Sequence, residues 1–448
     1  MRNLVLLLAL ASPACAVHIP GEREERERAL SELAALEPET PPPELPPEPT
    51  LHDYLRTAFH ADAALRRAYW EWRAALERIP QEASPPNVAL SFDYLFSDEH
   101  MSSWDRTTLG LSNDPSEMIP APSKLAAAGR RALEEARAAG LRFEAAKFRL
   151  QAGVTSLYAD LALHGELIQL QQEEVGLLAL QAGEADAQLA SGASQDDSVR
   201  RQTALELARL ELENLHAQMP ILTARMNALL GRAPDAPVPL PAALPEPPAL
   251  GARDDELLAR VAERSPELAA LAREVSGREE ALDLAQQAEI PDFGFSLSLT
   301  GSVERMVGGM LTLPVRREAI AGGIAEADAL LHAAQAAREQ YGRDLAAAAV
   351  LDLVVLRNAE RQAALFREVL LPRAELLARS AEAGLSSGQA DLGAVLAARS
   401  ELLEARRTLA QLQTERIKAL AAIESASDLD VDSLMHPRMG MVAGSPER

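Results

Sequence analysis

Two kinds of hydrophobic periodicity alternate along this chain. The helical kind dominates between Pro122 and Pro220, a stretch without internal proline. It is rich in Ala, Leu, Glu, Gln and Arg, the residues that lose least on entering a helix. The segment 189–194 (LASGAS) interrupts it with the Gly and Ser that end helices, and a new helix is expected after it. The pattern therefore predicts two long helices folded back on each other.

The return helix carries a regular apolar seam. Its apolar residues recur at alternating steps of three and four, which is typical of an antiparallel coiled coil. The seam consists of Leu205, Ala208, Leu212, Leu215, Met219, Leu222, Met226 and Leu229. The first helix, at about 60 residues, would be roughly 90 Å long. Such helices indicate an elongated coiled coil rather than an ordinary globular core.

The second periodicity has a period of two. It runs through residues 87–96, after a helix predicted for 51–79 that Pro80 is expected to end. Apolar residues fall on one side of this strand, with Leu95 as the exception; they are Val88, Leu90, Phe92, Tyr94 and Phe96. The length is about that of a membrane-spanning strand. A weaker strand is predicted for 107–112.

The same order of elements returns in the second half of the chain. The pattern predicts, in order, a helix 254–288, strands 292–300 and 305–313, a long helix 316–383, a turn 384–388 and a return helix to residue 426. In strand 292–300 the residues of one side are Phe293, Phe295, Leu297 and Leu299. Phe92 corresponds to Phe295, 203 residues on, and Val154 to Val350, 196 residues on. We therefore predict two copies of a helix–strand–strand–helix–helix unit.

These patterns give the predicted organisation of the chain. It comprises an export signal 1–16, a charged helix and Pro-rich linker 17–50, a first repeat 51–231, a Pro-rich linker 232–250, a second repeat 251–426 and a tail 427–448. The export signal has Arg2 before a short apolar run, which is too short to span a membrane. Two interpretations of its end stay open. One is an ordinary cleavage site after Ala16, and the other is a lipoprotein signal that ends before Cys15, the future lipid anchor.

Composition excludes several functions. The net charge of −23 argues against a nucleic-acid partner, which would need a basic footprint. The eight histidines and the single cysteine form no ligand cluster, so neither a metal site nor a cofactor is predicted. Neighbouring carboxylates lie on long solvated helices, where general acid–base chemistry is not expected. The chain is therefore not expected to be an enzyme.

The predicted strands decide the class of protein. Each of the two apolar strands is expected to turn one face outward. These outward faces carry Phe92, Tyr94, Phe293 and Phe295, and the opposite faces of the strands are small and polar. Such a hairpin is marginal in water, but lipid accommodates it if the sheet closes into a barrel. Four strands do not close a barrel, so several chains would have to share one. The alternative is a water-soluble α+β protein whose strands pack on helices.

Several short motifs resemble the TolC-like outer-membrane efflux proteins, which form the outer channels of tripartite efflux pumps and type I secretion systems. The resemblance covers residues 51–426, and its matching stretches are Ser265-Pro-Glu-Leu268, Ile290-Pro-Asp-Phe293, Leu313-Pro314, Leu371-Pro372 and Leu385-Ser-Ser-Gly388. It implies a mainly α fold with a small β part. Three copies would form a 12-stranded β-barrel in the outer membrane and an α-helical tunnel of long hairpins in the periplasm.

The resemblance also implies partners. The hairpin tips would meet a periplasmic adaptor protein that connects to an inner-membrane pump; these tips contain Leu189, Ser191, Gly192, Leu385, Ser386 and Gly388. The family often carries an aspartate ring where this chain has Ala394 and Ala397, so only Asp391 remains as an entrance acid. The turn 119–125 (IPAPSKL) resembles the metal-efflux branch and points to metal cations as cargo, beside organic compounds or peptides. A periplasmic coiled-coil scaffold without a pore is the alternative function.

Overall fold

The computed structural model describes residues 17–36, 45–96, 101–113, 118–190, 195–241, 244, 253–302 and 304–427. The predicted export signal with Cys15, the tip residues Ser191 and Gly192, and residues 428–448 of the tail lie outside this part. For Leu189 only the backbone is described. The chain divides into two compact units. Unit 1 contains residues 1–34, 67–143 and 267–341, and unit 2 contains residues 35–66, 144–266 and 342–448.

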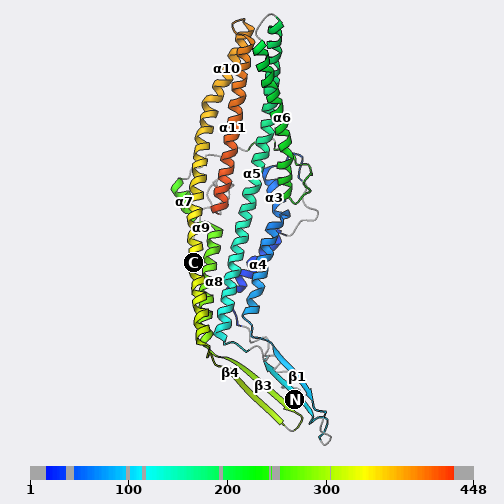
Figure 1. Cartoon of the computed structure of the whole chain (residues 1–448), viewed down its shortest axis with the longest axis vertical. Coiled ribbons are helices and arrows are strands. Elements are labelled where there is room, and N and C mark those ends of the chain that lie inside the picture. The colour runs from blue at the N-terminus through cyan, green and yellow to red at the C-terminus, as the bar shows by residue number, and fades with distance from the viewer. Residues whose placement is uncertain are drawn as a thin grey trace, which may run out of the picture. The chain divides into compact units, whose positions relative to one another are not determined.

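Unit 1 holds a single antiparallel sheet of four strands (Figure 1). The strands are β1 (Val88–Tyr94), β2 (Thr107–Asn113), β3 (Asp292–Thr300) and β4 (Glu304–Thr312), and they lie in the order β1-β2-β3-β4. All four strands were predicted, and the largest difference is that β1 stops two residues before the predicted end. The pairing of β2 with β3 joins strands from the two predicted repeats.

The helices of unit 1 are α2 (Glu22–Leu36), most of α4 (Ala63–Glu82), the first part of α5 (Pro122–Ala190), α8 (Pro266–Gln286), the short 3-10 helix η2 (Gln287–Glu289) and the first part of α9 (Arg317–Leu365). A buried aromatic cluster joins α2, α4 and α5. The Trp72 indole donates to a Glu25 carboxylate oxygen at 3.1 Å, and the Tyr69 hydroxyl donates to the Ala29 carbonyl at 3.0 Å. Trp72 also stacks on Phe143. The charged segment predicted before the first repeat is therefore a docked helix.

Unit 2 contains the two helical hairpins. Its elements are α3 (Leu51–Ala61), the rest of α5, α6 (Gln195–Leu229), α7 (Asp254–Arg264), the rest of α9, a π-helical turn η3 (Phe366–Leu370), α10 (Leu371–Ser386) and α11 (Leu392–Ser427). The predicted seam of α6 faces α5: the His164 ring contacts the Leu215 carbonyl at 2.6 Å, and Gln171 donates to the Ala208 carbonyl at 3.1 Å. All eight seam residues are buried or half-buried, so the antiparallel packing is confirmed.

Two predicted helices are each broken into two. Helix 51–79 breaks at Asp62, whose ψ of 122° is extended and whose carboxylate caps the Leu65 amide at 2.6 Å. Helix 254–288 breaks at Ser265, with ψ 116°, because the proline that follows disfavours a helical conformation in the residue before it. Pro80 does not end its helix, which continues to Glu82. Proline has no amide to donate to the Leu76 carbonyl, and the Arg26 guanidinium donates to that carbonyl instead, at 2.9 Å.

The start of the linker between the predicted repeats is attached to unit 2. Its carbonyl groups accept hydrogen bonds from three side chains. Asn227 donates to Pro234 at 3.3 Å and to Ala236 at 2.7 Å, Arg232 donates to Pro237 at 3.1 Å, and Tyr54 donates to Pro239 at 2.6 Å. Burial raises the pKa of Tyr54 to about 12, and its ring packs edge-on against Tyr158. Residues 234–239 are therefore part of the packed structure.

Candidate functional site

The sheet has two chemically different faces. Directly paired residues lie on the same side of a sheet, so the register defines each face. Phe92 pairs with Leu109, Leu109 with Leu299, and Leu299 with Arg305. The other pairs on this side are Leu90–Leu111, Leu111–Leu297, Leu297–Val307 and Phe293–Leu311. The second side carries Ala89, Ser91, Gly110, Ser112, Gly294, Ser296, Ser298 and Gly308. One side is therefore largely apolar, with Arg305 and Gly309 as exceptions on β4. The other side is small and polar on β1, β2 and β3, whereas β4 adds Met306 and Met310 to it.

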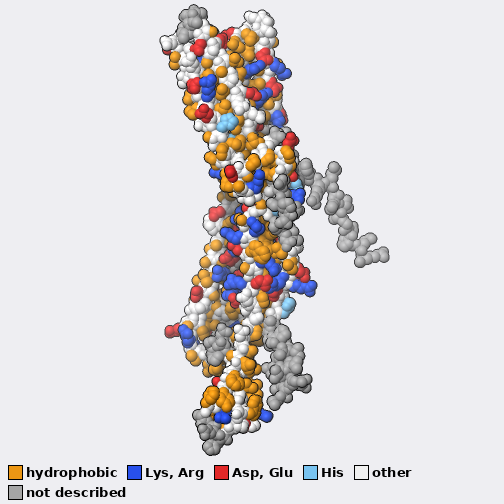
Figure 2. All heavy atoms as spheres, turned by 90° about the vertical axis from the view of Figure 1, so that its right-hand side faces the viewer, with side chains coloured by type: hydrophobic (Ala, Val, Ile, Leu, Met, Phe, Trp, Pro, Cys, Tyr) orange, Lys and Arg blue, Asp and Glu red, His pale blue; other side chains and the backbone are white. Residues whose placement is uncertain are grey.

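The apolar face is open to its surroundings. Hydrophobic side chains gather over the strands, at the lower end of Figure 2. Phe92 is 67% exposed, and Leu90, Val307 and Leu311 are also exposed. Of the predicted lipid-facing residues, Phe92 and Phe293 are exposed, whereas Tyr94 and Phe295 are half-buried. The alternation of side chains along each strand and the register between strands place all four residues on this one face. An exposed apolar face of this size marks an interaction surface.

The sheet has two free edges. In the described part of the chain, no strand pairs with the outer side of β1 or of β4. Each edge therefore presents a row of unpaired backbone donors and acceptors. One edge comes from the first half of the chain and the other from the second half. This arrangement suits head-to-tail pairing with further copies of the same sheet.

Asp105 joins the loop between β1 and β2 to the turn between β3 and β4. Its carboxylate accepts from the Ser102 hydroxyl at 2.6 Å and from the Ser302 amide at 2.8 Å. Gly301 adopts φ +53° directly beside Asp105, where a Cβ atom would clash with the Asp105 backbone. The hydrogen bonds from Ser102 and Ser302 lower the pKa of Asp105 to about 2. Asp105 therefore holds a loop of the first half against a turn of the second half.

The other end of the sheet is fixed by Lys124, in the first turn of α5. Its ammonium group donates to the Ile290 carbonyl at 2.7 Å and to the Asp292 carboxylate at 2.8 Å, and the lysine side chain is largely buried. These contacts connect the turn 119–125 to the start of β3. The motif 119–125 and the motif Ile290-Pro-Asp-Phe293 therefore form one structural junction, although the sequence alone did not connect them.

The described hairpin tip lies between α10 and α11. Gly388 has φ +74°, the left-handed conformation that glycine adopts most cheaply. Leu385 and Ser386 form the exposed end of α10. The Asp391 carboxylate accepts from the Ala394 amide at 2.7 Å, which is the contact of a helix N-cap. Asp391 therefore has a capping function in this chain, whatever else it does in an assembly.

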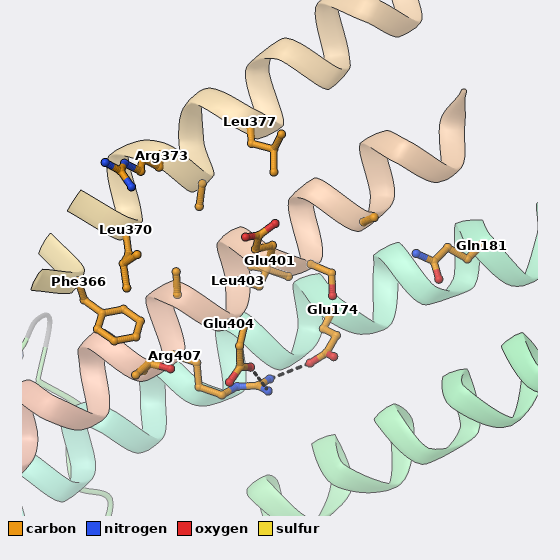
Figure 3. Close-up of a pocket in the computed structure, with 15 residues that line it drawn as sticks. Glu174, Gln181, Phe366, Leu370, Arg373, Leu377, Glu401, Leu403, Glu404 and Arg407 are labelled. Atoms are coloured by element: carbon orange, nitrogen blue, oxygen red, sulfur yellow. Dashed lines mark hydrogen bonds and ion pairs between the residues drawn. The ribbon is translucent and has the colours of Figure 1, made fainter. Parts of the chain in front are cut away.

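A groove follows the π-helical turn in unit 2 (Figure 3). It has a volume of about 940 Å³ and lies between α5, α10 and α11. Phe366 and Leu370 point toward α11, whereas Arg373 points away from the groove. Arg407 closes one end, where it donates to Glu174 of α5 at 2.7 Å and forms an ion pair with Glu404 at 3.2 Å.

Chemistry beyond packing is sparse in the described residues. No three His, Cys, Asp or Glu side chains come together there as a metal site would require. No helix in the described part combines the length and the apolar character needed to cross a membrane. The exposed sheet face, the free edges and the hairpin tip are therefore the surfaces that the described residues offer to partners or to lipid.

Solved structures with a similar architecture include outer-membrane channels. VceC of Vibrio cholerae, an outer membrane protein, is 19% identical with a TM-score of 0.65, and the match covers 84% of this chain and 95% of VceC. The MtrE channel of Neisseria gonorrhoeae is 18% identical with a TM-score of 0.66 and coverages of 84% and 88%. The CmeC channel of Campylobacter jejuni is 14% identical with a TM-score of 0.66 and coverages of 86% and 88%. The chain has the TolC-like fold.

This TolC-like fold confirms the resemblance found in the sequence motifs, and it confirms the mainly α architecture with a small β part. No protein-family model and no curated protein matches the chain. At these identities the likeness shows the fold alone. The trimer, the barrel, the domain boundaries and the roles of the individual site residues stay predictions.

Proposed function

We propose that this protein is the outer-membrane channel of a tripartite efflux system. Three copies would place twelve strands in one barrel in the outer membrane and twelve long helices in one periplasmic tunnel. The largely apolar face of the sheet, bounded by two free edges, carries this proposal. Closing the sheet with further copies satisfies the edges, and lipid covers the apolar face. The role is that of a passive duct, without enzymatic chemistry.

The assembly can be tested directly. Membrane fractionation, mild detergent extraction and native mass measurement should give an outer-membrane homotrimer, and the purified trimer should conduct ions in a planar bilayer. A water-soluble monomer with protease-resistant strands would contradict the channel. That outcome would instead favour the coiled-coil scaffold without a pore.

The direction of the sheet can be tested with single arginines. Phe92→Arg or Phe293→Arg should each cost about 2–4 kcal/mol if the residue lies near the middle of the bilayer. Both variants should therefore assemble poorly in the outer membrane. Ser298→Arg, on the small polar face, is the matched control and should assemble. Normal assembly of both Phe variants would show that this face does not meet lipid.

The partners follow from the same proposal. The tip with Leu385, Ser386 and Gly388 would contact the periplasmic adaptor, together with Leu189, Ser191 and Gly192 of the other hairpin, and the adaptor would connect to an inner-membrane pump. Thiol-specific cross-linking from Ser386→Cys in intact cells should capture this adaptor. Capture from a residue in the middle of α9 instead would contradict the assignment.

Three finer points also belong to this proposal. Cys15 would carry a lipid anchor, and mass spectrometry of the mature N-terminus tests it, because a free Val17 would exclude the anchor.

Asp391 would add a ring of three charges at the entrance, and unchanged ion selectivity in Asp391→Asn would leave only its capping role. Metal cations are the first cargo to test. The turn 119–125 suggested this cargo, and the contacts of Lys124 support a structural role for the same turn.

A further inference from the structure

The strands β1 to β4 carry four charged side chains, and the sign of the charge differs between the two faces of the sheet. Asp93, Asp292 and Glu304 lie on the small polar face. Arg305 lies on the apolar face, where it pairs with Leu299 and is exposed. An arginine on the lipid-facing side of a barrel destabilises it most at the bilayer midplane and least near the interface. The position of Arg305 along its strand therefore matters.

Arg305 lies at the turn end of the apolar face. It is the second residue of β4, whereas Leu313 directly follows the other end of this strand, before the chain enters α9. These two residues are eight positions apart, or about 27 Å of extended chain. At a strand tilt of about 40° this is roughly 20 Å along the membrane normal, close to the height of about 25 Å of the apolar band of a barrel. Arg305 therefore lies near the boundary of that band, on the side away from α9.

The same end of the sheet carries aromatic side chains and a second arginine. Tyr94, the last residue of β1, lies edge-on to Phe96 with 4.8 Å between the ring centroids. The Arg106 guanidinium lies over the Tyr94 ring, 5.7 Å from its centroid. Phe96 and Trp104 are 85% and 53% exposed. Exposed aromatic rings and arginines with apolar stems are typical of the interface between the apolar band and the lipid headgroups.

No described carboxylate neutralises either arginine. The Asp105 carboxylate accepts from Ser102 and Ser302, and Glu304 lies on the opposite face of the sheet from Arg305. The Nε atom of Arg106 is buried and has no hydrogen-bond partner among the described residues. Both guanidinium groups therefore offer positive charge and N–H donors, the combination that binds phosphate oxygens.

The spacing of the two arginines limits the ligand. The Arg106 guanidinium lies at the β1 edge and Arg305 belongs to β4, the other edge of the sheet. Three strand spacings, about 14 Å, separate these edges. A single phosphate would meet only one arginine. A glycolipid with a phosphate at each end of a disaccharide would meet both, and its acyl chains would lie on the apolar side chains of the four strands.

We propose that Arg106 and Arg305 bind the two phosphates of a lipid A-type glycolipid, whose acyl chains cover the apolar face of the sheet. This inference rests on the proposed channel, because a channel with its helices in the periplasm places the turn end of the sheet in the outer leaflet. It adds to that channel a specific lipid, which conduction itself does not require.

Binding is tested on the full-length oligomer purified in mild detergent. Diphosphorylated lipid A is titrated into it, and the bound lipid is counted by native mass spectrometry. Arg106→Gln and Arg305→Gln should each lower the affinity about tenfold, because each removes a charged hydrogen bond to a phosphate. Arg316→Gln is the matched control. This exposed arginine lies beyond the other end of β4, and its loss should change the affinity by less than about twofold.

The chemistry of the added lipid provides a second measurement that needs no variant. Monophosphorylated lipid A should bind the wild-type oligomer about tenfold more weakly than the diphosphorylated form. Equal binding of phosphatidylglycerol would indicate a general anionic surface, and complete displacement of the lipid by inorganic phosphate would indicate a free-anion site. Either result would overturn the glycolipid site.

The outcome for this site is separable from the outcome for the channel. Equal lipid A affinity in wild type, Arg106→Gln and Arg305→Gln would overturn the two phosphate contacts. If these proteins still form oligomers that conduct ions, the channel proposal stands without the lipid site. A wild-type chain that neither forms an oligomer nor conducts would contradict the channel, and the lipid site with it.

Discussion

The two long hairpins of unit 2 share one plan but differ in their surroundings. Helix α5 is continuous over 69 residues, whereas its counterpart is interrupted by the π-helical turn between α9 and α10. Tyr158 of α5 is 7% exposed, and Val354, which is 196 residues later on α9, is 53% exposed. The local hydrophobic pattern is similar in both helices. The difference shows that burial depends on which elements pack against a helix. The hydrophobic pattern of the helix itself does not encode this.

The cover over α5 is specific to the first half of the chain. Tyr54 of α3 packs edge-on against Tyr158 and donates to the docked linker at Pro239. In the second half, Leu257 occupies the place of Tyr54, 203 residues later, and packs in a core cluster with Leu353 and Leu356. A shallow groove of about 240 Å³ remains beside Val354. The smaller residue cannot reproduce either contact of the tyrosine.

The largest expected effect contrasts Leu403 with Leu207. Leu403 of α11 is buried in a cluster with Leu396 and with Leu170 and Leu177 of α5. Leu403→Ala removes this side chain and should lower the free energy of unfolding by about 2–5 kcal/mol. Leu207→Ala, at the corresponding but exposed position, should change it by less than about 0.5 kcal/mol in the dissociated monomer. Urea unfolding followed by circular dichroism measures both. Equal losses in the monomer would mean that Leu207 is as buried in the isolated chain as Leu403 is.

The next effect concerns the start of the two long helices. Lys124 fixes α5 to the start of β3, whereas the residue 195 positions later, at the start of α9, is Ala319. Lys124→Ala should lower the free energy of unfolding of unit 1 by about 1.5–3 kcal/mol, because it leaves Asp292 without its charged partner. Arg23→Ala removes an exposed ion pair with Glu27 and serves as the control, with no change in the urea midpoint expected. A midpoint for Lys124→Ala that equals this control would exclude a role in stability.

A smaller effect is expected from Tyr54→Phe. Loss of the hydrogen bond to Pro239 should cost about 0.5–1.5 kcal/mol. Burial raises the pKa of Tyr54 to about 12, above its ordinary value of about 10. The stabilising contribution of the neutral phenol is therefore present below pH 10 and lost as the pH rises through about 12. Unfolding of wild type and Tyr54→Phe at pH 8 to 12 should converge at the alkaline end, and parallel curves would contradict this.

The smallest effect lies at the loop end, where the two halves meet. The pKa of Asp105 is lowered to about 2, so its contribution is present above the ordinary value near 4 and lost as the pH falls through about 2. Hydrogen exchange at the Ser302 amide should stay slow at pH 4 and become fast below pH 2. Asp105→Asn should show faster exchange at both pH values. Slow exchange in that variant would mean that the Ser302 amide is protected by something other than the carboxylate.

Much of this fold could be predicted from periodicity alone. The strands, both hairpins and the seam of α6 follow from spacing, because apolar residues at a period of two or 3.6 face one side. The break at Ser265 was missed although its signal was present, since the next residue is a proline. The matching break at Asp62 has no proline and could be found only through the 203-residue correspondence. Lys124 and the docked linker could not be predicted, because their partners lie far away in the sequence or are backbone carbonyl groups.

The small polar face of the sheet has a consequence for permeation. Along β1 and β3 this face carries mostly glycine, alanine, serine and threonine. Of its carboxylates, Asp93 and Glu304 lie near the turns, and Asp292 lies at the opposite end of the sheet, where Lys124 neutralises it. In the proposed barrel this face would line the water-filled bore. Most of the bore would then lack fixed charge, so anions and cations would diffuse through it at similar rates. Selection by charge would be confined to the mouth, where six carboxylates from three copies would raise the local concentration of cations.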